Sequence, residues 1–584
     1  MREVSTPPLA DLAGYRNVTD LLVRRVAEAP DHVAFDVADS GGWRAVSTAQ
    51  FADQVRGVAR GLIAAGLEPG QSVAIMSPTR YEWAVADLGV WFAGGVVVPV
   101  YESSAASQVA AIVADAGVRI AFAGDERSRA VLAEAGVPVV IDLAEGLPGL
   151  VERGADVADA DVERARVHAG PASPATIVYT SGTTGRPKGV VLTHENFLGQ
   201  VLNIAAAYSD IVRPDGNTVI FLPLAHVLAR GLQLICLAGG MRIAHLSAPS
   251  EVVASLAVLR PTFLVVVPRV LEKIASAAAG KASDKHLGRL WAAAVRTAID
   301  AGAAAERADA DTGGPMRGAA ALRHRIFDLL FYRRIRGLLG GRLRYVLSGG
   351  ATLPARLSLL FRGMGVPVIE GYGLTETTAP LTGNLPGRIR SGTVGLPLPG
   401  STVRISADGE VLARGVGVFA GYRDPVDDAA AFVDGFFRTG DLGRLDERGH
   451  LVLDGRVKDV VTTSNGKTVA PARWEAAIEE HPLVSSAVTV GEGRPYLTAL
   501  IVLDPDAVAA RPRASSPTED PALRADVQRA VDEANALVSR SEQVRRFALV
   551  VADSDDRELV TPTLKIRRRE LLHREASTID SLYA

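Results

Sequence analysis

The residues with the clearest chemical potential lie in one stretch, Thr176–Phe197. An apolar β-branched run, 177–179, leads into residues 180–189, which hold four hydroxyl side chains, three glycines and two cations. Glycines allow the backbone to approach a ligand closely, backbone N–H groups and hydroxyls can surround a phosphate, and Lys188 adds a point charge. A second apolar run, 190–192, follows. We therefore predict a strand, a phosphate-binding loop and a second strand.

This loop differs from the Walker pattern, because it has no G-x-x-x-x-G-K-[ST] followed by a helix. The alternative interpretation is an ordinary polar hairpin turn. The density of glycines and hydroxyls, and the β-branched run behind them, favour the phosphate loop.

A second candidate group follows a predicted strand, Val366–Ile369. There Thr375 and Glu376 end the run Glu-Gly-Tyr-Gly-Leu-Thr-Glu. Ligands of doubly wound folds lie at the carboxyl ends of strands, and a hydroxyl beside a carboxylate suits an α-phosphate and a Mg²⁺ that shares phosphate oxygens. Taken alone, Thr-Glu is also a common helix cap.

Two further motifs lie towards the C-terminus. Asp441 follows a tight turn and could accept both hydroxyls of a ribose, although a plain turn aspartate has the same pattern. Lys565 follows an extended Thr-Pro-Thr segment, where an isolated lysine would be a solvated charge. The chain has seven lysines against fifty-six arginines, and four of the seven fall in candidate motifs: Lys188, Lys458, Lys467 and Lys565.

The elements that position these groups are predicted from a repeated pattern of a helix, a glycine and a strand. Ser47–Ala65, Tyr81–Ala93 and Ala106–Ala116 are predicted helices, each followed by a short apolar strand, which indicates an α/β layer with a largely parallel sheet. Residues 144–175 are expected to be a connecting segment, 271–309 a long helical region interrupted near Gly280, 386–443 a small β-barrel or sandwich, and 526–544 a helix. The composition shifts beyond Asp454 towards a compact α+β module, so the charged turn 454–459 is a candidate domain boundary.

The composition limits the class of protein to which the chain can belong. The 584 residues exceed one core, so two or more domains are expected. A net charge of −3 gives no reason to expect a nucleic-acid surface. One cysteine, Cys236, excludes an intrachain disulfide and fits a reducing compartment. We see neither a signal peptide nor an apolar run of about 18 residues, and we expect a cytoplasmic location.

In order and spacing, these stretches resemble the core motifs of the adenylate-forming superfamily, which comprises acyl-CoA synthetases, non-ribosomal adenylation domains and luciferases. The resemblance covers about Val18–His573. It implies an α/β fold with a large N-terminal AMP-binding domain, 1–454, made of two α/β sheet subdomains and a small β-barrel. A hinge at 455–458 and a small mobile α+β C-terminal domain, 459–584, would follow.

The resemblance also implies roles for individual residues. The ATP phosphates would be held by Thr180, Ser181, Gly182, Thr183, Thr184, Gly185 and Lys188. The adenine side would be formed by Ser348, Gly349, Gly350, Ala351, Glu370, Gly371, Tyr372 and Gly373. Thr375 would contact the α-phosphate, Glu376 with Thr184 would bind Mg²⁺, and Asp441 supported by Arg456 would hold the ribose. Lys565 would be the catalytic lysine, Lys458 the hinge, and Ser464, Asn465, Gly466 and Lys467 the loop that lines the CoA tunnel.

Three segments, 222–227, 267–273 and 347–351, resemble the long-chain fatty acyl-CoA synthetase branch in its bacterial, actinobacterial-like form. This branch implies that fatty acid, ATP and CoA are the substrates and that an acyl-AMP is formed before the thioester. It also implies that His226 lies between the acyl tunnel and the thiol, with a structural strand-end histidine as the alternative.

Other interpretations stay open. One is a ligase that delivers the acyl-adenylate to a carrier protein; such enzymes typically carry an insertion before the hinge, and residues 443–459 are short. Another is CoA ligation of a different carboxylate, and a third is a non-catalytic nucleotide- or lipid-binding protein, which the intact Lys188, Glu376, Asp441 and Lys565 disfavour. Residues 333–336, with three arginines, indicate either a peripheral contact at the inner face of a membrane or a solvated helix face.

Overall fold

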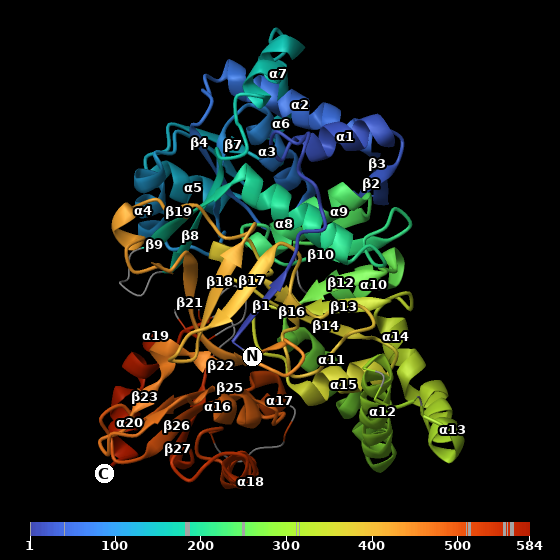
Figure 1. The fold of residues 1–584 in the computed structure, drawn as a ribbon, viewed down its shortest axis with the longest axis vertical. Coiled ribbons are helices and arrows are strands. Elements are labelled where there is room, and N and C mark those ends of the chain that lie inside the picture. The colour runs from blue at the N-terminus through green and yellow to red at the C-terminus, as the bar shows by residue number, and fades with distance from the viewer. Residues whose placement is uncertain are drawn as a thin grey trace.

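The computed structural model describes residues 2–39, 41–181, 187–247, 251–310, 312–314, 316–509, 511, 516–552, 556, 559–560 and 566–584. Two large sheets with helices on both faces form the upper and middle parts of the molecule in Figure 1, and a smaller α+β part lies below them. No helix among these residues is long and apolar enough to cross a membrane.

The first sheet carries the phosphate loop. Its seven strands run in the order β19-β9-β8-β5-β4-β6-β7, with the four from β5 to β7 parallel. They are β4 Ser72–Met76, β5 Val96–Val100, β6 Ile120–Ala123, β7 Val139–Asp142, β8 Pro174–Ser181, β9 Pro187–Thr193 and β19 Gly421–Tyr422. Alternate side chains of β4 enter different cores: Val73 and Ile75 pack with α2 (Thr48–Ala64) and α3 (Tyr81–Phe92), whereas Ala74 and Met76 pack with α4 (Ala106–Ala116).

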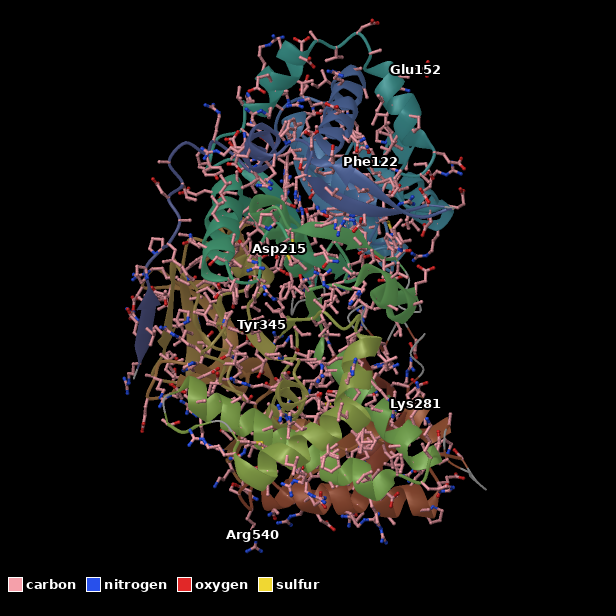
Figure 2. The ribbon with its side chains drawn as sticks, turned by 90° about the vertical axis from the view of Figure 1, so that its right-hand side faces the viewer. Phe122, Glu152, Asp215, Lys281, Tyr345 and Arg540 are labelled. Atoms are coloured by element: carbon pink, nitrogen blue, oxygen red, sulfur yellow. The ribbon has the colours of Figure 1, made fainter. Side chains whose placement is uncertain are left out.

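The second sheet has nine strands in the order β16-β15-β14-β13-β12-β10-β11-β2-β3. They are β2 Val33–Asp39, β3 Gly42–Ser47, β10 Asn217–Ile220, β11 Arg242–His245, β12 Phe263–Val266, β13 Tyr345–Ser348, β14 Val368–Tyr372, β15 Thr382–Gly383 and β16 Leu396–Pro397. Figure 2 shows Phe122 of β6 in the upper part of the molecule and Tyr345 of β13 near its middle. One face of this sheet packs on α9, Val227–Gly239, and the other packs on α12, Gly288–Asp309, and α15, Ala355–Gly363.

The prediction that residues 144–175 form only a connecting segment is wrong. It contains two helices, α6 Gly146–Arg153 and α7 Asp159–Arg166. Leu150 of α6 and Val162 of α7 are buried in the same core as α2 and α3. Few other residues of these two helices are apolar, so the sequence shows no clear helical periodicity there. This part of the chain also contains three further helices, α1 Asp20–Glu28, α5 Glu126–Glu134 and α8 His194–Ala207.

The long helical region is real, but its predicted break is misplaced. Gly280 lies inside α11, Pro268–Asp284, and the chain turns instead at 285–287, where His286 has φ +59°. A residue with a left-handed backbone cannot continue an α-helix, so α12, Gly288–Asp309, starts anew. The following elements are α13 Gly318–Phe327, the π-helical turn η2 Asp328–Tyr332, α14 Arg333–Leu338 and α15 Ala355–Gly363.

The predicted small β-barrel is wrong. The described strands form an open six-stranded sheet, β1-β17-β18-β21-β20, with β22 paired to β21. They are β1 Glu3–Thr6, β17 Ser401–Ile405, β18 Glu410–Gly415, β20 Phe432–Val433, β21 Phe436–Leu445 and β22 Leu451–Arg456. The N-terminal β1 pairs with β17 and so takes the edge that closure would have required; a four-residue strand nearly 400 positions away leaves no local signal.

The C-terminal part has its own core around a three-stranded sheet, β25-β26-β27. Its elements are β23 Val461–Thr462, β24 Thr468–Val469, α16 Ala472–Glu479, β25 Val484–Val490, β26 Leu497–Leu503, α17 Pro505–Ala509, α18 Pro521–Ala536, β27 Val544–Val551, α19 Arg568–Arg574 and α20 Ala576–Ser581. The helix predicted to reach Val544 ends at Ala536, because Val544 already belongs to β27.

Two ion pairs join this part to α11. Arg269 pairs with Asp504, and the Lys273 ammonium lies 3.1 Å from a carboxylate oxygen of Asp506. The domain limits 1–454, 455–458 and 459–584 remain a prediction.

Candidate functional site

Lys188, which was predicted to lie in the phosphate loop, is the second residue of strand β9. Strands β8 and β9 pair antiparallel with Thr180 opposite Lys188, so the sheet fixes both ends of the loop. The Lys188 ammonium lies 2.7 Å from a carboxylate oxygen of Asp427 and 5.3 Å from the centroid of the Tyr422 ring. The loop positions themselves lie outside the described residues, as does the Ser181 side chain; they are Gly182, Thr183, Thr184 and Gly185.

Tyr422 connects this lysine to Glu376. β19 pairs with β9, and the Tyr422 hydroxyl donates to Oε1 of Glu376 over 3.1 Å. Glu376 and Thr375 belong to η3, Thr375–Thr377, a short helix that follows β14. Burial raises the pKa of the Glu376 carboxyl, since the buried anion lacks water. The Lys188 ammonium, the Tyr422 phenol and the Glu376 carboxyl are therefore neighbours in space, close to the end of β14.

A second group centres on Asp441, which is 5% exposed. Its Oδ1 forms an ion pair with the Arg456 guanidinium, with Nε at 2.9 Å, and its Oδ2 accepts a hydrogen bond from the Tyr372 hydroxyl over 2.6 Å. Burial first, and then the Asp441 charge, raise the pKa of Tyr372 well above its usual value, so the phenol remains a donor. Each carboxylate oxygen has about two acceptor sites, so one on each oxygen is left for a ligand.

The two groups form one cluster. The charges of Arg456 and Asp441 both act on the Glu376 carboxyl, Arg456 lowering its pKa and Asp441 raising it. A positive centre at Lys188, an acid at Glu376 and a carboxylate at Asp441 thus surround the end of β14, an arrangement that can bind phosphate, a cation and a sugar diol.

Ser348, the last residue of β13, lies beside Glu370 in the middle of β14. Both are nearly fully buried, and burial raises the pKa of Glu370 to about 8. Among the described residues, the Ser348 hydroxyl and Oε1 of Glu370 have no hydrogen-bond partner. A Cβ placed on Gly349 would lie 3.5 Å from the Gly371 carbonyl, so the two predicted adenine segments, 348–351 and 370–373, are in contact.

His226 caps the start of α9, and its Nδ1 accepts from the backbone N–H of Leu228 over 3.2 Å. The Leu228 side chain would lie 3.6 Å from a Cβ on Gly349. The beginning of α9 therefore packs against the segment 348–351, which brings His226 to the same edge of the second sheet.

The remaining predicted residues lie in the C-terminal part. Lys458 is exposed in the short helix η5, Val457–Asp459. Ser464, Asn465, Gly466 and Lys467 form the exposed turn between β23 and β24, where Gly466 adopts φ +72° and Ser464 N–H donates to the Arg494 carbonyl. Lys565 lies outside the described residues, so the structure gives no position for it.

Sequence reasoning missed Tyr422 and Asp427. Both follow Phe419-Ala420-Gly421 in a glycine-rich stretch, and their importance comes from β19 pairing with a strand more than 200 residues earlier. The available signal was weak: one tyrosine and one acid after a glycine.

The comparisons with known proteins agree with this geometry. The family described as AMP-binding enzyme matches residues 22–423, and the family described as AMP-binding enzyme C-terminal domain matches residues 458–584. The long-chain-fatty-acid–CoA ligase FadD15 of Mycobacterium tuberculosis is 38% identical, with both chains covered completely. The human long-chain-fatty-acid–CoA ligase 1 is 28% identical over 92% of this chain and 82% of its own.

Solved structures show the same fold. ATP-bound MatB from Rhodopseudomonas palustris superposes with a TM-score of 0.71 at 24% identity and covers 96% of this chain and 99% of its own. The anthranilate CoA ligase AuaEII in complex with anthranoyl-AMP gives a TM-score of 0.73 at 19% identity and covers 97% and 98%.

Proposed function

The chain belongs to the AMP-binding enzyme family, and on that premise we propose that it is an ATP-dependent long-chain fatty acid–CoA ligase. One observation carries the choice of substrates: the FadD15 relatives match over the full length of both chains, and their name is long-chain-fatty-acid–CoA ligase. We also propose the predicted division into 1–454, a hinge at 455–458 and 459–584, with a cytoplasmic location that fits the single, buried cysteine.

In the first step, a fatty acid carboxylate attacks the α-phosphate of ATP, an acyl-AMP forms and pyrophosphate leaves. All reacting groups are negative, so positioning and charge neutralisation should dominate catalysis. Lys188 would hold the β- and γ-phosphates after exchanging its contact with Asp427. Asp441 would accept the ribose hydroxyls at its two remaining acceptor sites, and Thr375 and Lys565 would contact the α-phosphate.

Glu376 has the right chemistry for Mg²⁺, because a carboxylate oxygen is a preferred ligand of this hard cation. Among the described residues, no cluster of three or more His, Cys, Asp or Glu could hold a metal ion alone. Glu376 would therefore bind a cation that arrives with the ATP phosphates, and Thr184 could add a hydroxyl. When bound, the ion would neutralise phosphate charge.

In the second step, the CoA thiol attacks the acyl carbonyl, a thioester forms and AMP leaves. We propose that the C-terminal part rotates about Lys458 between the steps, so that the turn Ser464–Lys467 replaces Lys565 at the cluster. Rotation would also keep water from the labile acyl-AMP. His226, at the start of α9, would stand where thiol and acyl group meet.

Product analysis tests this proposal. Purified protein is incubated with ATP, Mg²⁺ and fatty acids of increasing chain length, with and without CoA. Acyl-CoA and AMP should form only when CoA is present, with the highest rates for long chains. Accumulation of acyl-AMP that ignores CoA would instead favour a carrier protein as acceptor, and activity only on other carboxylates would refute the fatty acid assignment.

A further inference from the structure

The helical segment α13-η2-α14 exposes an apolar stripe to solvent. Leu322, Ile326, Leu329 and Leu330 are 62%, 49%, 66% and 40% exposed. Their spacing of four, seven and eight residues places them on one face of the helix. Figure 1 shows α13 at the outer edge of the molecule, away from the C-terminal part.

The stripe is not the face that holds this segment on the protein, because another face of the same segment packs inward. Phe327, Tyr332 and Ile335 are buried, the Tyr332 hydroxyl donates to the Ala294 carbonyl over 2.6 Å, and the Phe331 ring contacts Trp291 at 5.5 Å between centroids. One face of the segment therefore packs on α12, while the apolar side chains of the stripe are exposed among the described residues.

The segment that carries the stripe is rich in arginine, and so are the residues next to it. Between residues 317 and 344 there are eight arginines and one acid, Asp328. Asp328 pairs with Arg336, and the other seven arginines are exposed. Within the described part of the chain, no carboxylate pairs with the arginines that flank the stripe: Arg323, Arg325, Arg333 and Arg334.

We propose that this basic apolar face, defined by Leu322, Ile326, Leu329, Leu330 and their flanking arginines, docks on the surface of an anionic phospholipid bilayer. Exposed leucines can enter the boundary between headgroups and acyl chains, and arginines beside them can contact lipid phosphates. The four flanking arginines disfavour a self-complementary contact with a second copy, since like charges would face one another there. The inference rests on the proposed function, because a long-chain acid partitions into membranes.

A hollow next to the stripe enlarges its apolar side. A cavity of about 450 Å³ lies between α12 and α13 and is lined partly by Ala301, Ala305, Ala321 and Leu322. Apolar surface on this side of the molecule therefore extends from the stripe into the groove beside it.

Vesicle sedimentation tests the docking. Full-length protein without ATP or CoA is mixed with vesicles of phosphatidylglycerol and phosphatidylcholine in equal parts, or of phosphatidylcholine alone. We expect binding to the anionic vesicles, weakened by salt. R333Q/R334Q should lower the partition coefficient about 25-fold, at about fivefold per arginine, and L329S should lower it about tenfold. Rates with a fatty acid short enough to dissolve without vesicles should not change.

The matched control is L537S/R540Q, which removes an exposed leucine and arginine at the end of α18 and should bind vesicles like the parent. Equal binding to both vesicle types, or parent-like binding by the stripe variants, would overturn the docking. So would dissociation of a dimer by L329S in light scattering without any vesicle binding, because a second copy would then cover the face. Since sedimentation needs no catalysis, an inactive ligase that still binds vesicles would refute only the proposed reaction.

Discussion

Replacing Asp441 by Asn provides the sharpest test of the nucleotide site. Both carboxylate oxygens are already engaged, one by Arg456 and one by Tyr372, and each keeps about one acceptor site for a ribose hydroxyl. The amide has one oxygen, and its NH₂ group must face either Arg456 or Tyr372, which are both donors. At least one ribose contact is therefore lost, and the other becomes neutral.

The magnitude follows from these contacts. Two hydrogen bonds to a charged acceptor contribute about 3–6 kcal/mol, and a single neutral bond about 1 kcal/mol. The net loss of about 2–5 kcal/mol corresponds to a fall of about 30- to 4,000-fold in kcat/KM for ATP. The assay is fatty-acid-dependent release of pyrophosphate over a series of ATP concentrations, with Tm recorded to show that the variant folds.

ATP analogues make the test specific. With 2′-deoxy- and 3′-deoxy-ATP, the parent should lose about 10- to 100-fold for each missing hydroxyl, while D441N should lose little more, because the acceptor is already gone. If D441N discriminated against both analogues as strongly as the parent, Asp441 would not be the ribose acceptor, and the reasoning would be refuted even if activity had fallen.

Three further predictions use other parts of the site. K565A should lower adenylation about 100- to 1,000-fold while ATP binding persists; an unchanged rate of fatty-acid-dependent pyrophosphate exchange would exclude the role given to Lys565. Y422F removes the donor to Glu376 and should change the Mg²⁺ concentration for half-maximal rate by about two- to tenfold, whereas unaltered Mg²⁺ dependence would separate Glu376 from the cation. Burial raises the pKa of Glu370 to about 8, so the folded state holds a proton that the unfolded state loses above its ordinary carboxyl pKa, and stability should fall as pH rises from about 5 to about 8. E370Q should remove this component, so its Tm relative to the parent should increase across that pH window, and a constant difference would contradict the assignment.

Local patterns allowed much of the fold to be predicted. The β-branched runs around the loop became β8 and β9 with Thr180 opposite Lys188, and the helix–glycine–strand phrases became parallel strands. Both are determined by neighbours within about twenty residues, which is the range over which periodicity carries information.

What could not be predicted depends on distant pairing. β1 takes the edge of β17, which leaves the predicted barrel open, and β19 brings Tyr422 against Lys188. The break after α11 depends on the left-handed backbone of His286, and neither glycine nor proline stands at 285–287 to mark it in the sequence. In the site, the types and order of the motifs led to the prediction that Arg456 supports Asp441. Only the structure shows that the Tyr372 hydroxyl is a second partner of Asp441.

The two ion pairs that join α11 to residues 504–506 have a consequence for the timing of turnover. Pairs at least partly open to solvent contribute about 0.2–1 kcal/mol each, so Arg269–Asp504 and Lys273–Asp506 together shift the population of this arrangement by about two- to thirtyfold. A bias of that size is large enough to make one orientation prevail and small enough for thermal motion to reverse it on the microsecond-to-millisecond scale of domain motions. The C-terminal part would then be held by an attachment that salt weakens and that exchanges faster than a typical catalytic cycle.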